Sequence, residues 1–387
     1  MPALNNRDES ACDITFWLYF GRNYSFLFHS TLFNTRFQLV GQMALLMPSH
    51  RAAANKYNYN FPAGFNPMLN KQTDVAPAAN AAGLSYVVYQ VTDLFTAQHF
   101  LEDFGLTRVM ITEDRLFMRG VGSDAYLYEA RLGDHCSFIG AGFSVSSLAE
   151  LEALSLLPGS RPIEPSDAPG AGLQVRMLAP EGFEITALFG QNAAPLATAS
   201  SARALNMNGA KPRINSSVRI QRQAGDVLRL GHFVLRVKDH DAMVTWFNER
   251  LGLIASDYLV ATPDSQRALA TFLRCDHGQH LVDHHCLFVI GAGETGVHHC
   301  SFEVEDFDAL ASAHDYLEQR GARLVCGIGR HLLGSQIYDY WLDPFGFRVE
   351  HYTDGDVVDA EHRPGFHAVT AEETTQWGMP PPPDFFT

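Results

Sequence analysis

The chain is poor in positive charge and in cysteine. Its 387 residues include 28 Lys or Arg and 43 Asp or Glu, which gives a formal net charge of -15. Nucleic acids and anionic membranes bind clustered basic residues, and the sequence contains no such cluster. The six cysteines have no Cys-x-x-Cys spacing, which argues against a thiolate zinc site and against a disulfide framework. We therefore expect a cytoplasmic protein that acts on a small molecule, with neither nucleic acid nor a membrane as a partner.

The sequence also lacks an uninterrupted apolar run long enough to span a membrane. Its most apolar N-terminal region, Ile14 to Met47, is broken by Arg22, His29 and Arg36, and acidic residues precede it. Such a region is a poor membrane span and a poor signal peptide. Residues 1–80 show no clean periodicity and end in Ala, Asn and Pro, so we interpret them as an extension that is partly disordered or lies on the surface.

What the sequence does contain is an internal repeat. A strand, a helix and a terminating glycine occur twice in the same order, at 85–91, 93–104 and Gly105 and again at 231–237, 239–250 and Gly252. Two further pairs of segments match: 124–145 with 283–304, which have equal length and end in Phe-x-Val, and the Pro-x-Gly turns at 180–182 and 344–346. Several matches in one order indicate a duplicated unit.

The repeat predicts the domain organisation. Residues 81–191 form the first β-rich module and residues 227–354 the second. Between them, residues 192–226 are rich in Ala, Ser and Asn, as is typical of a linker. Residues 355–387 form a tail with four consecutive prolines, Pro380 to Pro383, which cannot be helix or central strand; we expect it to wrap the surface in an extended form.

Three candidate metal ligands lie on separate predicted strands of the second module. Alternation along each strand puts His232, His299 and Glu350 on its polar face, opposite apolar residues such as Phe233 and Phe302. Two imidazoles and a carboxylate suit Fe(II) or Mn(II), because three ligands on one side of the ion leave positions free for substrate and O2.

The first module provides an internal comparison for these three positions. In an alignment without gaps, Tyr86, Gly140 and Thr186 stand where His232, His299 and Glu350 stand in the second module. All three ligand types are therefore absent together. This coordinated difference favours a metal-binding role over ordinary strand histidines, although divergence of the first module is an alternative explanation.

Residues 81–354 resemble the type I extradiol ring-cleavage dioxygenases, such as catechol 2,3-dioxygenase and 2,3-dihydroxybiphenyl 1,2-dioxygenase, of the vicinal oxygen chelate superfamily. The similar motifs are Leu230-Gly231-His232-Phe233-Val234, the pair His284-His285, and the run His331 to Glu350 with Tyr340, Asp343-Pro344 and Gly346 inside it. The resemblance implies an α+β fold of two tandem vicinal-oxygen-chelate modules. Each consists of paired βαβββ units forming a cupped mixed sheet, with the metal site in the C-terminal module.

The resemblance also implies roles for single residues. It makes His232, His299 and Glu350 the ligands of Fe(II), and the same ligand set suits Mn(II). It makes His285, fourteen residues before His299, the acid–base histidine, and it places His331 and Tyr340 beside the substrate. A histidine titrates near neutrality, so it can take up a phenolic proton and later return one.

Other interpretations stay open at this point. His285 is alternatively a core histidine and Tyr340 a packing residue. His284, His298 and His351 are interpreted as structural or surface residues. His277 and His280 are interpreted as solvated loop residues.

The function implied is extradiol cleavage of a catechol-type ring by O2 to a muconic-semialdehyde-type product, by an enzyme that is a homo-oligomer. Val234, Cys326 and Asp339 depart from the family pattern, the first two where some relatives carry asparagine or arginine. The polar groups that could bind a carboxylate are therefore absent at these positions. Their absence favours an apolar-substituted catechol, or a trihydroxylated ring such as trihydroxytoluene, as the substrate over a carboxylated catechol. The alternatives are a glyoxalase-like metal-dependent isomerase, whose ligands usually come from two modules, and a non-catalytic protein that binds aromatics or metal.

Overall fold

The computed structural model describes residues 76–196, 203–265, 267–368, 370, 372–382 and 385, and the strands β1 (Asp13–Tyr19) and β2 (Ser25–Thr31). β1 and β2 pair as an antiparallel hairpin, with Asp13 opposite Thr31. The sequence did not predict this hairpin. It belongs to a unit formed by residues 1–55, whereas residues 56–387 form a second unit. The remaining expectations for residues 1–75 lie outside the described residues.

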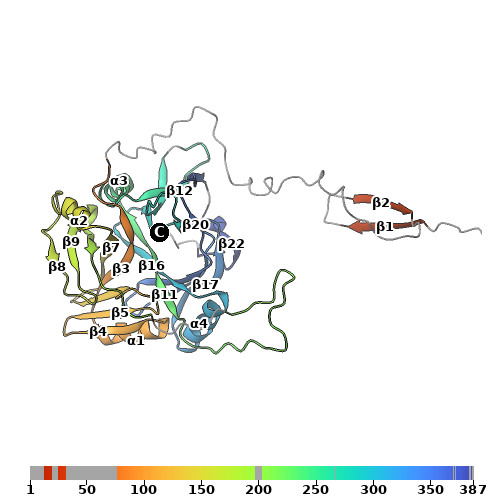
Figure 1. Ribbon diagram of the computed structural model, residues 1–387, viewed down its shortest axis with the longest axis horizontal. Coiled ribbons are helices and arrows are strands. Elements are labelled where there is room, and N and C mark those ends of the chain that lie inside the picture. The colour runs from red at the N-terminus through yellow and green to blue at the C-terminus, as the bar shows by residue number, and fades with distance from the viewer. Residues whose placement is uncertain are drawn as a thin grey trace, which may run out of the picture. The chain divides into compact units, whose positions relative to one another are not determined.

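The first module contains an eight-stranded mixed sheet in the order β4-β5-β6-β3-β7-β10-β9-β8 (Figure 1). Its two halves are βαβββ units that meet where β3 pairs antiparallel with β7. The first unit consists of β3 (Ala81–Val91), α1 (Leu94–Phe104), β4 (Thr107–Ile111), β5 (Arg115–Arg119) and β6 (Tyr128–Leu132). The second consists of β7 (Ser137–Val145), α2 (Leu148–Ser155), β8 (Glu164–Pro165), β9 (Leu173–Leu178) and β10 (Glu184–Phe189), with the short 3-10 turn η4 (Pro180–Gly182) before β10.

The second module repeats this plan in a ten-stranded sheet, β21-β12-β13-β15-β11-β16-β19-β18-β17-β22. Its first unit consists of β11 (Val227–Val237), α3 (His240–Leu251), β12 (Ile254–Val260), β13 (Ala268–Arg274) and β15 (Leu287–Gly291). Its second unit consists of β16 (Gly296–Val304), α4 (Phe307–Gln319), β17 (Arg323–His331), β18 (Ile337–Leu342) and β19 (Arg348–Thr353). The predicted α+β fold, with two modules of paired βαβββ units, is confirmed.

The helices α1, α3 and α4 begin where the sequence provides an aspartate to cap them. Asp93, Asp239 and Asp306 each accept a hydrogen bond from a backbone N–H in the first turn of α1, α3 and α4. Gly105 and Gly252 terminate α1 and α3 with φ of 116° and 64°, a left-handed conformation that glycine adopts without strain. An aspartate and a glycine thus begin and end the corresponding helices of the two modules, α1 and α3.

A single apolar core joins the two modules. The ring of Phe233 on β11 lies 6.0 Å from that of Phe138 and 6.1 Å from that of Phe143, both on β7. Phe104 at the end of α1 stacks on His351 of β19 at 3.8 Å, and Nε2 of His351 donates to the Phe104 carbonyl at 2.8 Å. Buried side chains of both sheets form one cluster, so the modules support each other.

The tail does not only wrap the surface in an extended form, as expected from the sequence. Parts of it form strands that pair with the second module. Its segments β21 (Gly365–His367) and β22 (Thr375–Gly378) pair with β12 and β17 at the two sheet edges, and β20 (Val357–Val358) pairs with β14 (Val282–Asp283). A 3-10 turn, η5 (Glu372–Thr374), precedes β22. Phe385 is only 1% exposed. Two open sheet edges offer unpaired backbone groups, which explains why a polar segment becomes strand here.

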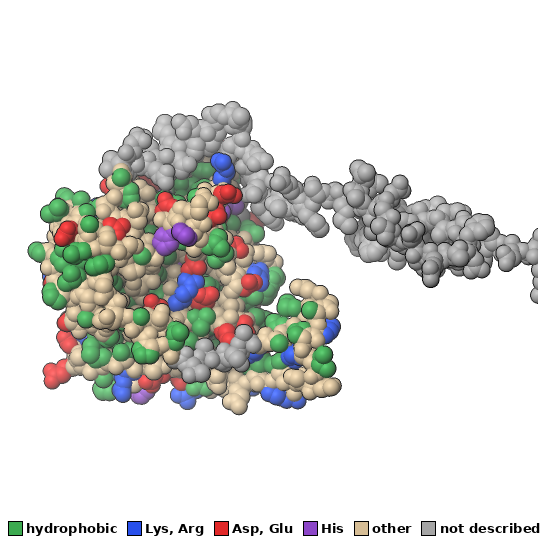
Figure 2. Space-filling view, in the orientation of Figure 1, with side chains coloured by type: hydrophobic (Ala, Val, Ile, Leu, Met, Phe, Trp, Pro, Cys, Tyr) green, Lys and Arg blue, Asp and Glu red, His purple; other side chains and the backbone are tan. Residues whose placement is uncertain are grey.

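The surface of the molecule carries charges of both signs. On the face shown in Figure 2, Lys and Arg side chains are scattered singly among Asp and Glu. No helix within the described part of the chain is long and apolar enough to cross a membrane. The candidate metal-binding and catalytic residues lie in the interior, in the second module.

Candidate metal centre and active site

Three neighbouring strands in the middle of the second sheet carry the predicted ligands. His232 on β11 pairs with Ser301 on β16, and Ser301 pairs with Glu350 on β19. His299 precedes Ser301 by two residues on β16, so both project from the same face. The register thus brings His232, His299 and Glu350 together on one side of the sheet.

The donor atoms of these side chains form a nearly equilateral triangle. Nε2 of His232, Nε2 of His299 and Oε2 of Glu350 are 3.3 Å apart in every pair. All three residues are buried. Among the described residues, Oε2 of Glu350 has no well-directed hydrogen-bond donor. A carboxylate oxygen and two ring nitrogens that face one buried point are costly unless a cation lies between them, so the residues fit a divalent metal ion.

The electrostatics give these groups the protonation states of metal ligands. Burial alone would raise the pKa of Glu350, but the adjacent imidazoles of His232, His299 and His331 lower it well below its ordinary value. Burial lowers the pKa of His299 to about 4, although Glu350 acts in the opposite direction. A carboxylate and a neutral imidazole bind metal without first losing a proton.

A glycine lets an aromatic ring approach the first ligand strand. A Cβ atom at Gly231 would lie 2.2 Å from the hydroxyl oxygen of Tyr352. Without it, Tyr352 packs across β11, with its ring centroid 5.8 Å from that of His232. The Leu-Gly-His sequence therefore has a packing reason beside its resemblance to a known motif.

A second histidine and the tail support His299 from behind. Nδ1 of His298 lies 2.6 Å from Nδ1 of His299, and Nε2 of His298 hydrogen bonds to the carbonyl of Phe385. Nη1 of Arg348 donates to the same carbonyl at 2.7 Å. If Nε2 of His299 binds a metal ion, its Nδ1–H is the donor to His298. His298, interpreted from sequence as structural or surface, is buried and contacts the candidate ligand His299.

A mostly apolar cavity adjoins the triangle. The other three predicted site residues, His285, His331 and Tyr340, line it together with His232 and His299. The remaining walls are Val234, Leu259, Phe272, Phe288, Leu333, Gln336, Thr374 and Phe385. Glu350 is joined to this wall through Oε1, which lies 3.3 Å from Nε2 of His331. The structure thus brings all six predicted residues to one place.

Three of the cavity residues are poised for proton chemistry. The ring of His285 lies 4.2 Å from that of His232, and Nε2 of His331 lies 2.8 Å from the hydroxyl of Tyr340. Burial, followed by the neighbouring His232 and His284, lowers the pKa of His285 well below its ordinary value. Burial and Glu350 raise the pKa of Tyr340 well above its ordinary value. At neutral pH, His285 is therefore uncharged and offers a lone pair, and Tyr340 keeps its proton and can donate a hydrogen bond.

The first module has the same register without the ligands. Tyr86 pairs with Gly142 and Gly142 with Thr186, just as His232, Ser301 and Glu350 are paired in the second module. The Tyr86 and Thr186 side chains line one pocket there. Beside them Glu129 is 1% exposed and accepts hydrogen bonds from Arg115 and Arg131 at 2.9 and 2.8 Å. An ion-pair network occupies the place of the metal site.

Sequence reasoning missed two parts of this site. Asp257 was not considered, and His284 was interpreted as structural or surface, yet both are buried directly behind His285. Phe385 lies in a Pro-rich tail that was expected on the surface. The spacing of these residues along the chain carries no periodic signal, although the adjacent pair His284-His285 was a hint.

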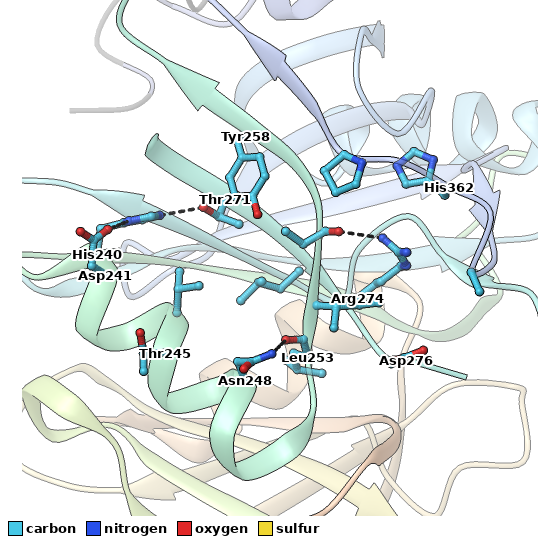
Figure 3. Close-up of a pocket in the computed structure, with 16 residues that line it drawn as sticks. His240, Asp241, Thr245, Asn248, Leu253, Tyr258, Thr271, Arg274, Asp276 and His362 are labelled. Atoms are coloured by element: carbon cyan, nitrogen blue, oxygen red, sulfur yellow. Dashed lines mark hydrogen bonds and ion pairs between the residues drawn. The ribbon is translucent and has the colours of Figure 1, made fainter. Parts of the chain in front are cut away.

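A separate cavity of about 460 Å³ lies between α3 and the strands β12 and β13 (Figure 3). His240 and Arg274 reach into it, but both are held: Nε2 of His240 lies 2.9 Å from the Thr271 hydroxyl, and Arg274 donates to the carbonyl of Ala255 at 2.8 Å. His362 is at its border. The candidate ligands of the first site do not line this cavity.

A sequence model of the Glyoxalase/Bleomycin resistance protein/Dioxygenase superfamily matches residues 229–351, which include all the ligand strands. The second module therefore contains a domain of this superfamily, as the resemblance implied. Among individual proteins, the chain is 26% identical to Metapyrocatechase 2 of Cupriavidus necator over 324 residues, which cover 81% of this chain and 95% of that protein. It is 32% identical to 3-methylcatechol 2,3-dioxygenase of Pseudomonas putida over 130 residues, 33% of this chain and 43% of that protein.

Solved structures share the two-module fold. Homoprotocatechuate 2,3-dioxygenase from Arthrobacter globiformis superimposes with a TM-score of 0.66 at 22% identity, over 81% of this chain and 92% of that one. The Mn(II)-bound glyoxalase from Novosphingobium aromaticivorans gives a TM-score of 0.65 at 21% identity, over 79% of this chain and 94% of that one. Since one fold includes both activities, the fold does not choose between them, and the site has to.

Proposed function

We propose that this protein is an Fe(II)-dependent extradiol dioxygenase that cleaves a catechol-type ring next to its two hydroxyls and yields a muconic-semialdehyde-type product. The observation that carries the proposal is the triangle of His232, His299 and Glu350, contained entirely in one module and open to an apolar cavity. The curated relatives named above support it, since their names denote catechol ring cleavage. A bound iron supplies the Lewis-acid and redox chemistry toward a vicinal diol and O2.

The chain's own residues have separate tasks in this reaction. His285 takes a phenolic proton of the substrate and returns it later, because its ring borders both His232 and the cavity. Tyr340 donates a hydrogen bond to a substrate oxygen, and His331 orients the Tyr340 hydroxyl at 2.8 Å. Phe272, Phe288 and Phe385 hold the ring and exclude water.

The cavity also supports a substrate class. None of the described residues that line it is Lys or Arg, so a carboxylate on the ring would be desolvated without a cationic partner. Val234 lies in the wall, and Cys326 is buried in a cluster with Tyr338, Tyr340 and Phe385. We propose an apolar-substituted catechol or a trihydroxylated aromatic as the substrate.

The test is anaerobic reconstitution with Fe(II) or Mn(II), followed by O2 and a panel of diols. The panel contains catechol, 3-methylcatechol, a biphenyl-type diol, trihydroxytoluene and a carboxylated catechol. We expect O2 uptake and a yellow product with the apolar members, restored by Fe(II), and much weaker turnover of the carboxylated one. Turnover of the methylglyoxal–glutathione adduct instead would make the protein a glyoxalase. Full metal occupancy without any turnover would make it a binding protein.

A further inference from the structure

A buried chain of hydrogen bonds leads from Asp257 to the cavity. Oδ2 of Asp257 lies 2.8 Å from Nε2 of His284, and Nδ1 of His284 lies 3.1 Å from Nδ1 of His285. The three residues are 7%, 3% and 4% exposed, so water does not compete for these bonds. Asp257 belongs to β12, whereas the two histidines lie between β14 and β15. The chain ends in the cavity wall at His285.

The carboxylate fixes the direction of every bond in the chain. A carboxylate only accepts hydrogen bonds, so Nε2 of His284 carries a proton and donates it to Asp257. A neutral imidazole has one donor and one acceptor nitrogen, so Nδ1 of His284 accepts. Nδ1 of His285 is then the donor of the next bond. Nε2 of His285 is left with a lone pair.

We propose that Asp257 and His284 are positioning residues that hold His285 in the tautomer whose Nε2 accepts the phenolic proton of the substrate. This inference rests on the proposed function, because it assigns a direction to the proton transfer at His285. An orienting carboxylate behind a catalytic imidazole is a known device, and here a second imidazole lies between the two. Phe272, in edge contact at 4.9 Å, and His232 at 4.2 Å restrict rotation of the His285 ring.

Asp257 is itself held in the ionised form that the chain requires. Its Oδ1 accepts from the backbone N–H of Gly365 at 2.7 Å and from Nε2 of His367 at 3.0 Å. Burial alone would raise the pKa of Asp257, but the hydrogen bonds from His284 and His367 bring it below its ordinary value. Gly365 and His367 belong to β21, so the C-terminal tail holds Asp257, the outer end of the hydrogen-bond chain.

A second metal ion is the competing explanation for this cluster. Asp257, His284 and His362 offer ligand atoms that all lie within 4.8 Å of one another. Nε2 of His362 lies 2.9 Å from the carbonyl oxygen of Ser256 and donates to it, so only Nδ1 of His362 could be a ligand. The oxygens of Asp257 are also satisfied by the hydrogen bonds already described. The observations therefore favour a hydrogen-bond chain over a metal site.

The kinetic test compares three variants of the Fe(II)-loaded protein. Asp257→Asn can donate its amide proton to His284 and so reverse the chain, and His284→Gln interrupts it. His362→Gln is the matched control, since it alters a histidine of the same cluster that bonds to the carbonyl of Ser256 and lies off the route to His285. We expect kcat of the first two variants to fall at least about tenfold while KM changes less than about threefold, and the control to keep its kcat. Asp257→Glu, which retains the carboxylate, should recover part of the loss.

Neutron diffraction of the metal-loaded protein gives a readout that does not depend on turnover. We expect deuterium on Nε2 of His284 and Nδ1 of His285, and its transfer to Nε2 of His285 in Asp257→Asn. Three results overturn the inference: deuterium on Nε2 of His285 in the unmodified protein, an unchanged kcat in His284→Gln, or a second metal ion per chain that Asp257→Asn releases. Failure of the proposed function looks different, because the unmodified protein then cleaves no diol while the proton positions still decide the inference.

Discussion

Nε2 of His232 lies 3.3 Å from Nε2 of His299, and Oε2 of Glu350 lies 3.3 Å from both. Two nitrogens that share a cation present lone pairs to it and cannot share a proton with each other. Their close approach in a buried site therefore has a physical explanation if an ion is bound between them.

The first prediction concerns metal content. His232→Ala, His299→Ala and Glu350→Gln each remove one ligand, so affinity for Fe(II) should fall by roughly 100-fold or more, with loss of activity. Metal analysis after anaerobic purification measures the effect. His280→Ala is the control, because His280 is exposed in a loop. Full iron occupancy in the three variants would contradict the assignment.

The second prediction concerns Phe385 as a wall of the cavity. Phe385→Ala opens space beside Tyr340, whose ring centroid lies 5.0 Å from that of Phe385. We expect kcat/KM for a catechol with a bulky apolar substituent to rise by about tenfold relative to unsubstituted catechol. Trp377→Ala, at a residue 45% exposed on β22, should leave the ratio unchanged. An unaltered ratio in Phe385→Ala would show that the tail does not select the substrate.

The third prediction concerns Asp343 in the turn before β19. Burial raises its pKa to about 6, although backbone N–H groups of Phe347 and Phe345 act against this. The folded protein then holds a proton that the unfolded chain releases near pH 4, so stability falls as pH rises from about 4 to 6.

Asparagine at this position keeps the hydrogen-bond acceptor and removes the charge. Asp343→Asn should therefore raise the free energy of unfolding at pH 8 by about 2 kcal/mol, with little gain near pH 4. Urea unfolding at the two pH values measures this. A variant that is less stable at pH 8 would mean that the charge is compensated in the fold.

The fourth prediction concerns Asp339, whose charge stabilises the folded protein, in contrast to that of Asp343. Asp339 is 0% exposed and accepts hydrogen bonds from Nδ1 of His314 at 2.9 Å and Nε1 of Trp341 at 2.8 Å. Burial alone would raise its pKa, but the hydrogen bond from His314 and the neighbouring ring of His351 lower it below its ordinary value. Its contribution to stability is therefore complete above the pKa of the unfolded chain and is lost at lower pH.

Asp339→Asn should cost about 3 kcal/mol at neutral pH, because it removes the negative charge of a buried ion pair with His314. The difference from the unmodified protein should shrink as pH falls below about 4. Unfolding curves at several pH values test this, with the exposed Asp241→Asn as the control. A neutral effect of Asp339→Asn at pH 7 would show that the pairing contributes nothing net.

The sequence predicted two modules because the order of elements is duplicated, whereas the βαβββ plan of each module was implied by the resemblance to a known family. Period-two alternation selected the strand faces that carry the candidate ligands. The register of the sheets explains why the comparison of modules without gaps worked: Val88 pairs with Gly140 as Val234 pairs with His299. The irregular pairings of β3 and β11 also occur at corresponding places.

The outer parts of the site could not be predicted in this way. Asp257 and His284 are 27 residues apart, and His298 meets Phe385 across 87 residues. Such contacts depend on how sheet edges and the tail come together, which no short-range pattern specifies. Asp339 illustrates the same limit: the sequence marked it as unusual, but only the positions of His314, Trp341 and His351 explain a buried carboxylate.

The aromatic packing around Phe233 links the metal-free half of the molecule to the iron chemistry proposed for the other. Phe233 directly follows the ligand His232, and its ring rests on Phe138 and Phe143 of the first module. The first module thus packs against β11, the strand of the second module that carries the candidate ligand His232. On the proposed function, retention of iron should therefore also depend on side chains of the first module that do not contact the ion, such as Phe138 and Phe143.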